Sequence, residues 1–528
     1  MLGRIERQIS ISDYWLQGKI PENSYWHRMR KWAMEYLDED MFQPLFSYYG
    51  RPSISPIYTF MGFLVQLEKG YSDREFEEES RFDDRVKYAI TAPRDFDGID
   101  AVTLHDHRTR FFNSDIGIKI FLQVLEQAKQ AGMFSEGNLH VIDSFMVWGK
   151  SARQDTYTMI YQAIKMVLRL ARLGDDISVE GLVILKRKDY DKKLKKPEVN
   201  WDDEEDKKKQ LDMLVKDALA LVKYIRKHAK AEDPDLLSAC KLLERVATQD
   251  VEKDENGMYI MSRGTAKDRV ISVNDPEMRH GHKSSSKIQD GYKAEIITGG
   301  EKGELVLGVK VDAANTPDGE HMSELIDEIE ESGHKIDKLY GDSAYCDFEE
   351  IEKREKEGME ICVKVQDAVN RNGLFTKDEF EINLEEGTVT CPAGEVAEFD
   401  KKKVKKRKKT SVNFSKETCE GCPLRDKCTN SKSGRQITIH KYEERLQEQR
   451  KYQKTREFKE DYSARANGER TISHVTRHGG RQSRFVGKGK TGIQILMACI
   501  NQNIKVVMGH IINKAKKPKI GEVCPILA

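Results

Sequence analysis

Two aspartates occupy notable positions in expected strands. Asp143 is the single acid in the apolar and aromatic run 141–148, and Asp342 closes the expected strand 336–342. Either aspartate alone is more often the cap of a turn or helix. Two carboxylates on neighbouring strands would instead repel each other unless divalent cations lay between them, and Mg²⁺ prefers oxygen ligands of this kind. The pair therefore predicts a two-metal site, with two Mg²⁺ or Mn²⁺ ions supporting in-line displacement at a phosphodiester.

A third acid for such a site is expected from a later helix. Spacings of three and four residues, which place side chains on one helical face, separate Tyr462, Arg465, Glu469, Ile472 and Thr476. The alternative is a solvent-facing helix, on which an Arg–Glu pair contributes only about 0.2–0.5 kcal/mol. We predict instead that Glu469 is the third catalytic carboxylate and a ligand of the metal site.

The segment that follows combines cations with glycines. Gly479, Gly480, Gly487 and Gly489 lie among Arg and Lys side chains, so the cations stand on flexible backbone. Such cations would contact DNA phosphates, which position a protein on the duplex without reading its sequence. The predicted DNA-binding residues are Tyr462, Arg465, Arg477, Arg481, Arg484 and Lys488.

Charge is strongly segregated although the net charge is +0. Residues 401–528 contain 32 Lys and Arg against 11 Asp and Glu, a net +21. Subtracting these from the totals of 89 and 89 leaves 57 against 78 for residues 1–400, a net −21. We expect the C-terminal quarter to face phosphates. A solvated lysine-rich tail would have the same composition, so charge alone does not decide between them.

Four of the nine cysteines are clustered by spacing. The others, at positions 240, 346, 362, 499 and 524, are scattered and fit buried small apolar side chains. In a cytosolic protein the clustered set favours thiolate metal ligation over disulfides. Structural Zn²⁺ is the expected metal, with a [4Fe-4S] cluster as the alternative. The clustered cysteines are Cys391, Cys419, Cys422 and Cys428.

Strands and helices alternate around the two aspartates in a recognisable order. A first strand at 141–148 is followed by a helical stretch at about 155–250. Later strands are expected at 292–297, 305–311, 336–342 and 359–365, with helices at about 320–331 and through Ile351. Without the helical stretch this is the order of an RNase-H-like α/β sheet of the retroviral integrase type, whose first three strands are antiparallel. The fold class follows from that order.

We therefore predict four segments. An N-terminal helical domain would bind DNA ends, and an RNase-H-like catalytic core with a helical insertion at about 150–265 would follow it. A small Cys-rich ribbon insertion precedes the C-terminal catalytic helices and basic tail. The predicted boundaries are 1–135, 136–378, 379–440 and 441–528.

In this order the segments resemble bacterial insertion-sequence transposases of the Asp-Asp-Glu class. The resemblance is to the branch with a Tyr-x2-Arg-x3-Glu-x6-Lys signature, of which Tyr462, Arg465 and Glu469 match three positions. Thr476 stands where the final Lys is expected, with Arg477 next to it. Further similar stretches lie at 50–75, 103–111 and 275–284. The resemblance implies metal ligation by Asp143, Asp342 and Glu469.

The function implied is metal-dependent DNA cleavage at the ends of a mobile element, followed by strand transfer. The implied partners are double-stranded DNA, as inverted repeats and as target, and a second copy of the chain in the active complex. One rival is an RNase-H-like nuclease without strand transfer. The other is a catalytically silent DNA-binding protein derived from a transposase, against which the intact acids argue.

The sequence also predicts that the chain has no membrane partner. It has no run of about 18 apolar residues, and its first 30 residues carry acids and aromatic residues where a secretory signal would be apolar. We therefore expect a bacterial cytoplasmic protein associated with the nucleoid.

Overall fold

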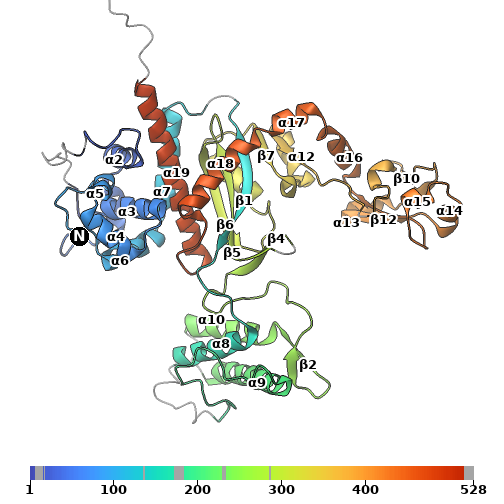
Figure 1. Cartoon of the computed structure of the whole chain (residues 1–528), viewed down its shortest axis with the longest axis horizontal. Helices are drawn as coiled ribbons and strands as arrows, with labels where there is room; N and C mark the ends of the chain where they lie inside the picture. Colours follow the sequence, from blue (N-terminus) through green and yellow to red (C-terminus); the bar gives the residue numbers. More distant parts are fainter. Residues whose placement is uncertain are drawn as a thin grey trace, which may run out of the picture.

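A six-stranded mixed sheet lies at the centre of the chain in the computed structural model (Figure 1). The structure describes residues 1–5, 16, 18–134, 137–171, 183–228, 233–284, 287–370 and 372–516. Strand β5 pairs antiparallel with β1, β6 and β4, whereas β1, β7 and β8 run parallel to one another. The strands are β1 (His140–Trp148), β4 (Arg279–Ser284), β5 (Lys287–Gly299), β6 (Leu305–Ala313), β7 (Lys338–Gly341) and β8 (Glu360–Val363).

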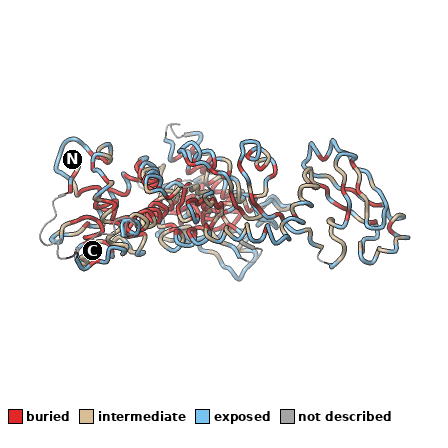
Figure 2. The backbone as a smooth tube through the Cα atoms, turned by 90° about the horizontal axis from the view of Figure 1, so that it is seen from above, coloured by how far each residue is buried: buried red, intermediate tan, exposed pale blue. Residues whose placement is uncertain are grey.

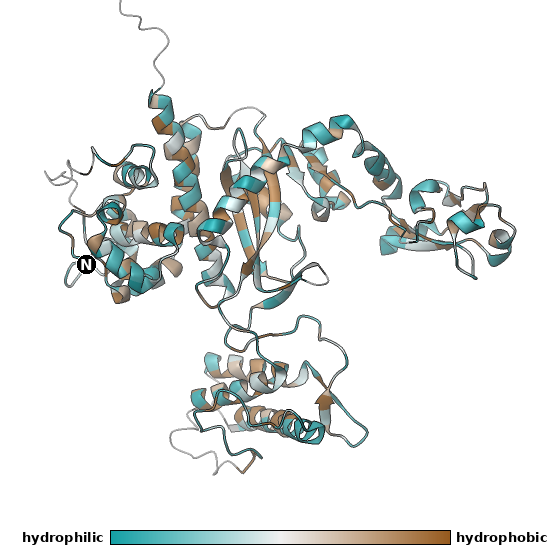
Figure 3. Ribbon diagram, in the orientation of Figure 1, coloured by the Kyte–Doolittle hydropathy of each residue, from teal (hydrophilic) through white to brown (hydrophobic). Residues whose placement is uncertain are grey.

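Each expected strand of the sheet lies at its predicted place, and most of these runs are rich in apolar β-branched or aromatic residues. The central strands are hydrophobic in Figure 3. Two helices link the parallel strands, namely α11 (Met322–Glu331) between β6 and β7, and α12 (Phe348–Lys356) between β7 and β8. A short 3-10 helix, η3 (Ser343–Tyr345), follows β7. The fold is therefore mixed α/β with a mixed sheet, as the order of strands and helices predicts.

The N-terminal helices share one hydrophobic core with the sheet. Helix α3 begins at Pro56 after the Ser55 cap and ends at Gly70, whose φ of 76° is left-handed. Ser72 and Glu75 form a capping box at the start of α4. The elements are α2 (Tyr25–Tyr36), η1 (Glu39–Leu45), α3 (Pro56–Lys69), α4 (Asp73–Phe82), α5 (Asp84–Ala89), α6 (Ala101–Phe112) and α7 (Ile116–Gln130).

The C-terminal helix joins these two parts. Helix α19 (Lys488–Lys516) packs against α7 on one side and β6 on the other (Figure 1). The buried Asn503 amide bonds both the N–H and the carbonyl of Val306, at 2.8 Å each. By length and composition α19 could cross a membrane, but 72% of its most apolar window is buried inside the protein. That burial is typical of a core helix, and it is the only such helix among the described residues.

The helical insertion forms a lobe with a hydrophobic core of its own. The lobe projects from the end of β1 and returns to β4 (Figure 1). Its elements are α8 (Thr156–Leu170), α9 (Glu204–His228), α10 (Pro234–Thr248), β2 (Val251–Lys253) and β3 (Tyr259–Met261).

The Cys-rich segment extends away from the sheet and has a small core of its own, as Figure 2 shows by its separate patches of buried chain. Its strands form a three-stranded and a two-stranded sheet. Its elements are η4 (Lys377–Glu379), β9 (Glu381–Asn383), β10 (Thr388–Thr390), β11 (Val396–Glu398), α13 (Lys401–Arg407), β12 (Lys409–Asn413), α14 (Lys416–Glu420), α15 (Arg425–Cys428) and β13 (Gln436–His440).

The predicted helix around Glu469 is divided in the structure. Helices α16 (Glu443–Tyr452), α17 (Arg456–Tyr462) and α18 (Arg465–Val475) follow one another, and a π-helical turn, η5 (Thr476–Gly480), follows α18. Tyr462 ends α17 and Arg465 begins α18, so the expected single face is wrong at this point. Thr455 caps α17 through its hydroxyl, which a pattern of apolar spacing does not reveal.

Candidate active site

Asp143 lies on β1, and Asp342 directly follows the adjacent parallel strand β7. His140 pairs with Leu339 and Val141 with Tyr340, and continuing this register by two residues sets Asp143 level with Asp342. The Asp143 carboxylate accepts a 2.8 Å hydrogen bond from the Ser144 N–H. The Asp342 carboxylate accepts one of 2.8 Å from the Ala344 N–H and so caps η3. The two acids therefore face the same edge of the sheet from fixed backbone.

Glu469 reaches this edge because α18 packs directly on β1. Gly468 permits the close approach, since a Cβ atom added there would lie 2.5 Å from the Val141 Cβ and 2.8 Å from the Thr298 hydroxyl. The Thr471 hydroxyl donates a 2.9 Å bond to the Gly303 carbonyl and holds the next turn. The acid following Gly468 is thereby placed over the sheet.

Arg465 links two of the three acids. Its guanidinium donates a 2.7 Å hydrogen bond to the Asp143 carboxylate and also bonds the Glu469 carboxylate one helical turn further on. The Arg465 side chain is 15% exposed and the Glu469 side chain 49%. Arg465 was predicted to bind DNA; in this structure its guanidinium contacts two acids of the site, and the DNA contact stays a prediction.

The electrostatics of Asp143 reflect a crowded acidic site. Burial raises the pKa of Asp143 to about 6; the Arg465 charge opposes this shift, and the neighbouring Asp342 and Glu469 add to it. Carboxylates that disfavour each other's ionisation in this way fit the charge of a divalent cation. Within the described residues, however, no three His, Cys, Asp or Glu side chains are arranged to hold one ion.

Helix α17 fixes the end of β7. The Tyr462 hydroxyl donates a 2.9 Å bond to the Gly341 carbonyl, next to Asp342. Asp461 accepts bonds from Lys338 at 2.8 Å and from the Tyr340 hydroxyl at 2.7 Å. Burial raises the pKa of Tyr462 to about 12. Tyr462, predicted to contact DNA, thus makes a structural contact at the site.

A second polar layer lies beside the acids and has no signal in the sequence. The Ser144 hydroxyl donates to Asp318 at 2.7 Å, and Lys293 pairs with Asp318 at 2.9 Å. Glu295 accepts bonds from two backbone N–H groups of the 319–321 segment, at 2.9 and 3.1 Å. The Tyr345 hydroxyl is buried without a hydrogen-bond partner in the described structure.

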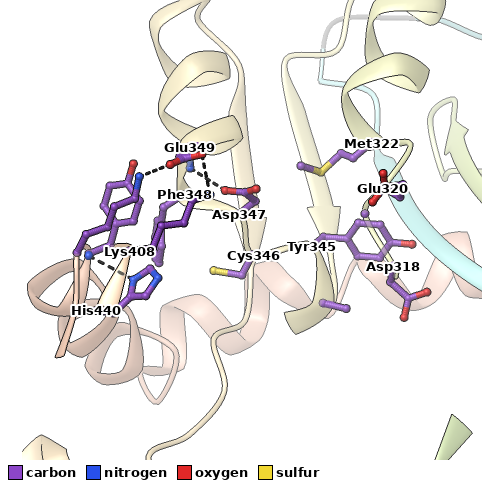
Figure 4. A pocket seen from close by; sticks show the side chains of 14 residues that line it. Asp318, Glu320, Met322, Tyr345, Cys346, Asp347, Phe348, Glu349, Lys408 and His440 are labelled. Carbon is purple, nitrogen blue, oxygen red and sulfur yellow. Dashed lines mark hydrogen bonds and ion pairs between the residues drawn. The ribbon is translucent and has the colours of Figure 1, made fainter. Parts of the chain in front are cut away.

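A pocket of about 350 Å³ opens next to this layer. Figure 4 shows Tyr345 and Asp318 on one wall and Lys408 and His440, from the base of the Cys-rich segment, on the other. Glu349 joins the walls through an ion pair with Lys408 at 3.1 Å. The pocket therefore lies where the Cys-rich segment meets the central sheet.

The four cations predicted after α18 do not share one environment. Arg477 and Arg481 are exposed. Lys488 is 43% exposed and pairs with Asp312 at 3.1 Å. The Arg484 guanidinium turns inward and donates to the Tyr71 carbonyl, and burial lowers its pKa. Arg477 and Arg481 are thus the two of these side chains most open to a partner.

The clustered cysteines approach one another in the folded segment. Burial raises the pKa of the Cys428 thiol, Arg435 opposes the shift, and thiolates at Cys419, Cys391 and Cys422 would raise it further. All eight described cysteines are free. The donor set fits a thiolate metal, although the described side chains are not arranged as a metal site.

Comparison with known proteins identifies one part of the chain. Residues 390–508 match the family model described as Transposase DDE domain. The match includes the clustered cysteines, Glu469 and most of α19, but neither β1 nor β7. It supports a DDE-type transposase and implies that DNA is the partner. No curated protein and no solved structure gives a significant match.

Proposed function

We propose that this protein is a metal-dependent DNA transposase that cleaves DNA at the ends of a mobile element and joins them to target DNA. Its catalytic unit is an RNase-H-like core built on the sheet β6-β5-β1-β7-β8. One observation carries the proposal, namely that Arg465 bonds both Asp143 and Glu469 beside the β1–β7 pair, whose register sets Asp342 level with Asp143. The family match at 390–508 supports it independently.

The three carboxylates are the proposed metal ligands. Two Mg²⁺ or Mn²⁺ ions per active site would activate water and the DNA 3′-hydroxyl, and they would stabilise the leaving oxygen. Arg465 positions the Asp143 and Glu469 side chains through its two hydrogen bonds. Ser144 and Ala344 hold the two aspartates with their N–H groups.

Arg465 also keeps the acids together before an ion arrives. Three carboxylates without a cation would repel one another and move apart, whereas the guanidinium neutralises part of their charge. Its role here is positional, since it is mostly buried and both of its described bonds go to acids of the site. The same role fits the Arg of the Tyr-Arg-Glu-Lys signature, to whose insertion-sequence branch we assign the chain.

DNA would enter from the side of the exposed Arg477 and Arg481. The lysine-rich helix α13 in the Cys-rich segment offers a second set of exposed cations. We propose that the four clustered cysteines hold one structural Zn²⁺ that shapes this segment. The active complex would be a homodimer on paired inverted repeats, formed in the bacterial cytoplasm at the nucleoid.

The decisive experiment uses the DNA that flanks the gene. Inverted repeats bracketing the gene would be cloned around a marker and incubated with the protein, a target plasmid and Mg²⁺. Cleaved ends together with joined products are expected. Cleavage without joining would favour the nuclease, and binding without cleavage would favour a silent DNA-binding protein.

A further inference from the structure

The helical insertion carries a lysine-rich segment without regular secondary structure. Residues 183–200 contain six Lys and one Arg against two Asp and one Glu, and no helix or strand is described between 183 and 203. We call residues 186–196 the basic loop. It lies in the lobe formed by α8, α9 and α10, which has its own core and contributes none of the three catalytic acids.

A buried acid fixes the start of the basic loop. Asp217 is only 1% exposed. Its carboxylate accepts hydrogen bonds from the N–H groups of Lys186 at 2.6 Å and Arg187 at 3.0 Å. It also accepts a 2.9 Å bond from the Tyr190 hydroxyl. A buried carboxylate is unfavourable unless its hydrogen bonds are made, so these contacts determine the path of the backbone.

The next turn of the loop is held by a buried ion pair. Arg187 and Asp189, both 8% exposed, pair at 2.7 Å. The Tyr161 hydroxyl on α8 donates a 2.7 Å bond to the Asp189 carbonyl. The one arginine of the loop thus turns inward and serves as an anchor.

Side chains of α8 hold the second half of the loop. The Lys165 ammonium donates to the carbonyls of Lys192 at 2.5 Å and Leu194 at 3.1 Å. The Gln162 amide donates to the Lys195 carbonyl at 2.9 Å. Each of these bonds goes to backbone, so the lysine side chains themselves remain available.

The result is a set of exposed lysine side chains on backbone that these contacts hold in place. Five lysines of the loop make no ion pair or hydrogen bond through their ammonium groups to any residue that the structure describes. They are Lys186, Lys192, Lys193, Lys195 and Lys196. All five residues are exposed. In contrast, Lys207 and Lys216 on the neighbouring helix α9 pair with Glu204 and Asp212.

We propose that the basic loop is a binding surface for the phosphate backbone of duplex DNA, separate from the catalytic acids. The inference rests on the proposed function. Side chains on an ordered loop lose less conformational entropy on binding than those on a flexible one. Exposed lysines bind phosphates without reading bases. The loop would therefore increase affinity for any duplex without selecting the element ends.

The test compares two variants of the full chain with equal charge. One replaces Lys193, Lys195 and Lys196 with Gln, and the control replaces Lys223, Lys227 and Lys241, which are exposed on α9 and α10. Binding to a 30-base-pair duplex of arbitrary sequence would be measured as a function of NaCl. We expect the loop variant to bind about tenfold or more weakly near 0.1 M salt, with the slope of log K against log[salt] reduced by about two to three. The control should stay close to wild type.

Three results would overturn the basic loop as a DNA surface. They are an unchanged slope in the loop variant, an equal loss in both variants, and a wild-type protein that binds no duplex. Only the last would also contradict the proposed function. If the wild type cleaves and joins DNA while the loop variant binds like it, the transposase proposal stands and the loop proposal fails.

Discussion

Arg465 on α18 donates a 2.7 Å hydrogen bond to Asp143 on β1, from a position 322 residues further along the chain. The same guanidinium bonds Glu469, so one side chain holds a strand acid and a helix acid together. Asp342 enters the group through the parallel pairing of β1 with β7. The predictions below follow from this arrangement.

Loss of any one acid should abolish DNA cleavage. Asp143→Asn, Asp342→Asn and Glu469→Gln keep the shape of each side chain but remove charge that a divalent cation needs, so cleavage should fall by about 10³-fold or more. Gel shifts should show DNA binding within a few-fold of wild type. Glu460→Gln, at an exposed pair on α17, is the matched control. An active Asp342→Asn enzyme would exclude the triad.

Cleavage should require Mg²⁺ or Mn²⁺. Ca²⁺ should support assembly on DNA better than chemistry, because its looser coordination places the nucleophile poorly. The measurement is cleavage of an end-containing duplex after dialysis against EDTA and addition of each ion. Full activity in EDTA would contradict the mechanism.

Ionisation of Asp143 should destabilise the metal-free protein as the pH rises towards about 6. The pKa of Asp143 is about 6 in the folded protein, against 3.8 for an ordinary aspartate, so the folded state binds the proton more tightly. Stability from this group is present below pH 3.8 and is lost as the pH rises through 6.

In EDTA at pH 8, the free energy of unfolding of Asp143→Asn should therefore exceed that of wild type by about 1–3 kcal/mol. The gain should shrink towards zero near pH 4. Denaturation curves across this range test it, with Glu460→Gln as the control. A constant difference at all pH values would show that packing, and not ionisation, causes the effect.

Gly468→Ala should disturb the proposed site, although Gly468 is not one of its acids. The new methyl group would lie 2.5 Å from the Val141 Cβ on a central strand, which has no room to move. We expect about 1–3 kcal/mol of destabilisation and at least a tenfold loss of cleavage, because α18 and with it Glu469 must shift. Gly489→Ala, where an added Cβ meets nothing within 4 Å, should be close to neutral. Unfolding and cleavage assays on both variants test this.

The Cys-rich segment should hold about one zinc ion per chain. Four thiolates would close a tetrahedral shell, so the ion should be structural and should leave cleavage chemistry to the acids. Cys422→Ser should lower the zinc content, the DNA affinity and the protease resistance of 380–440 together. Cys240→Ser, in the core of the insertion, should leave zinc unchanged. Absence of zinc and iron from the wild type would show that these are packed thiols.

Local features of the sequence were sufficient to predict five of the six strands of the central sheet and the helices α11 and α12. Apolar runs predict the strands that carry Asp143 and Asp342, and the Ser72 capping box predicts the start of α4. These patterns depend on near neighbours in the chain, whose periodicity is visible without the fold. The break between Tyr462 and Arg465 was missed because a two-residue turn interrupts the helix without altering the apolar pattern.

The sequence by itself determined which residue types were available, namely the acids, the clustered thiols and the basic surfaces. Tertiary structure alone decided their partners. It turned Arg465 towards Asp143 and Arg484 towards Tyr71, although both were expected to face DNA. The reason is that a cation pairs with whichever acceptor packing brings near. That proximity depends on contacts such as Gly468 against Val141, which are made between residues hundreds of positions apart.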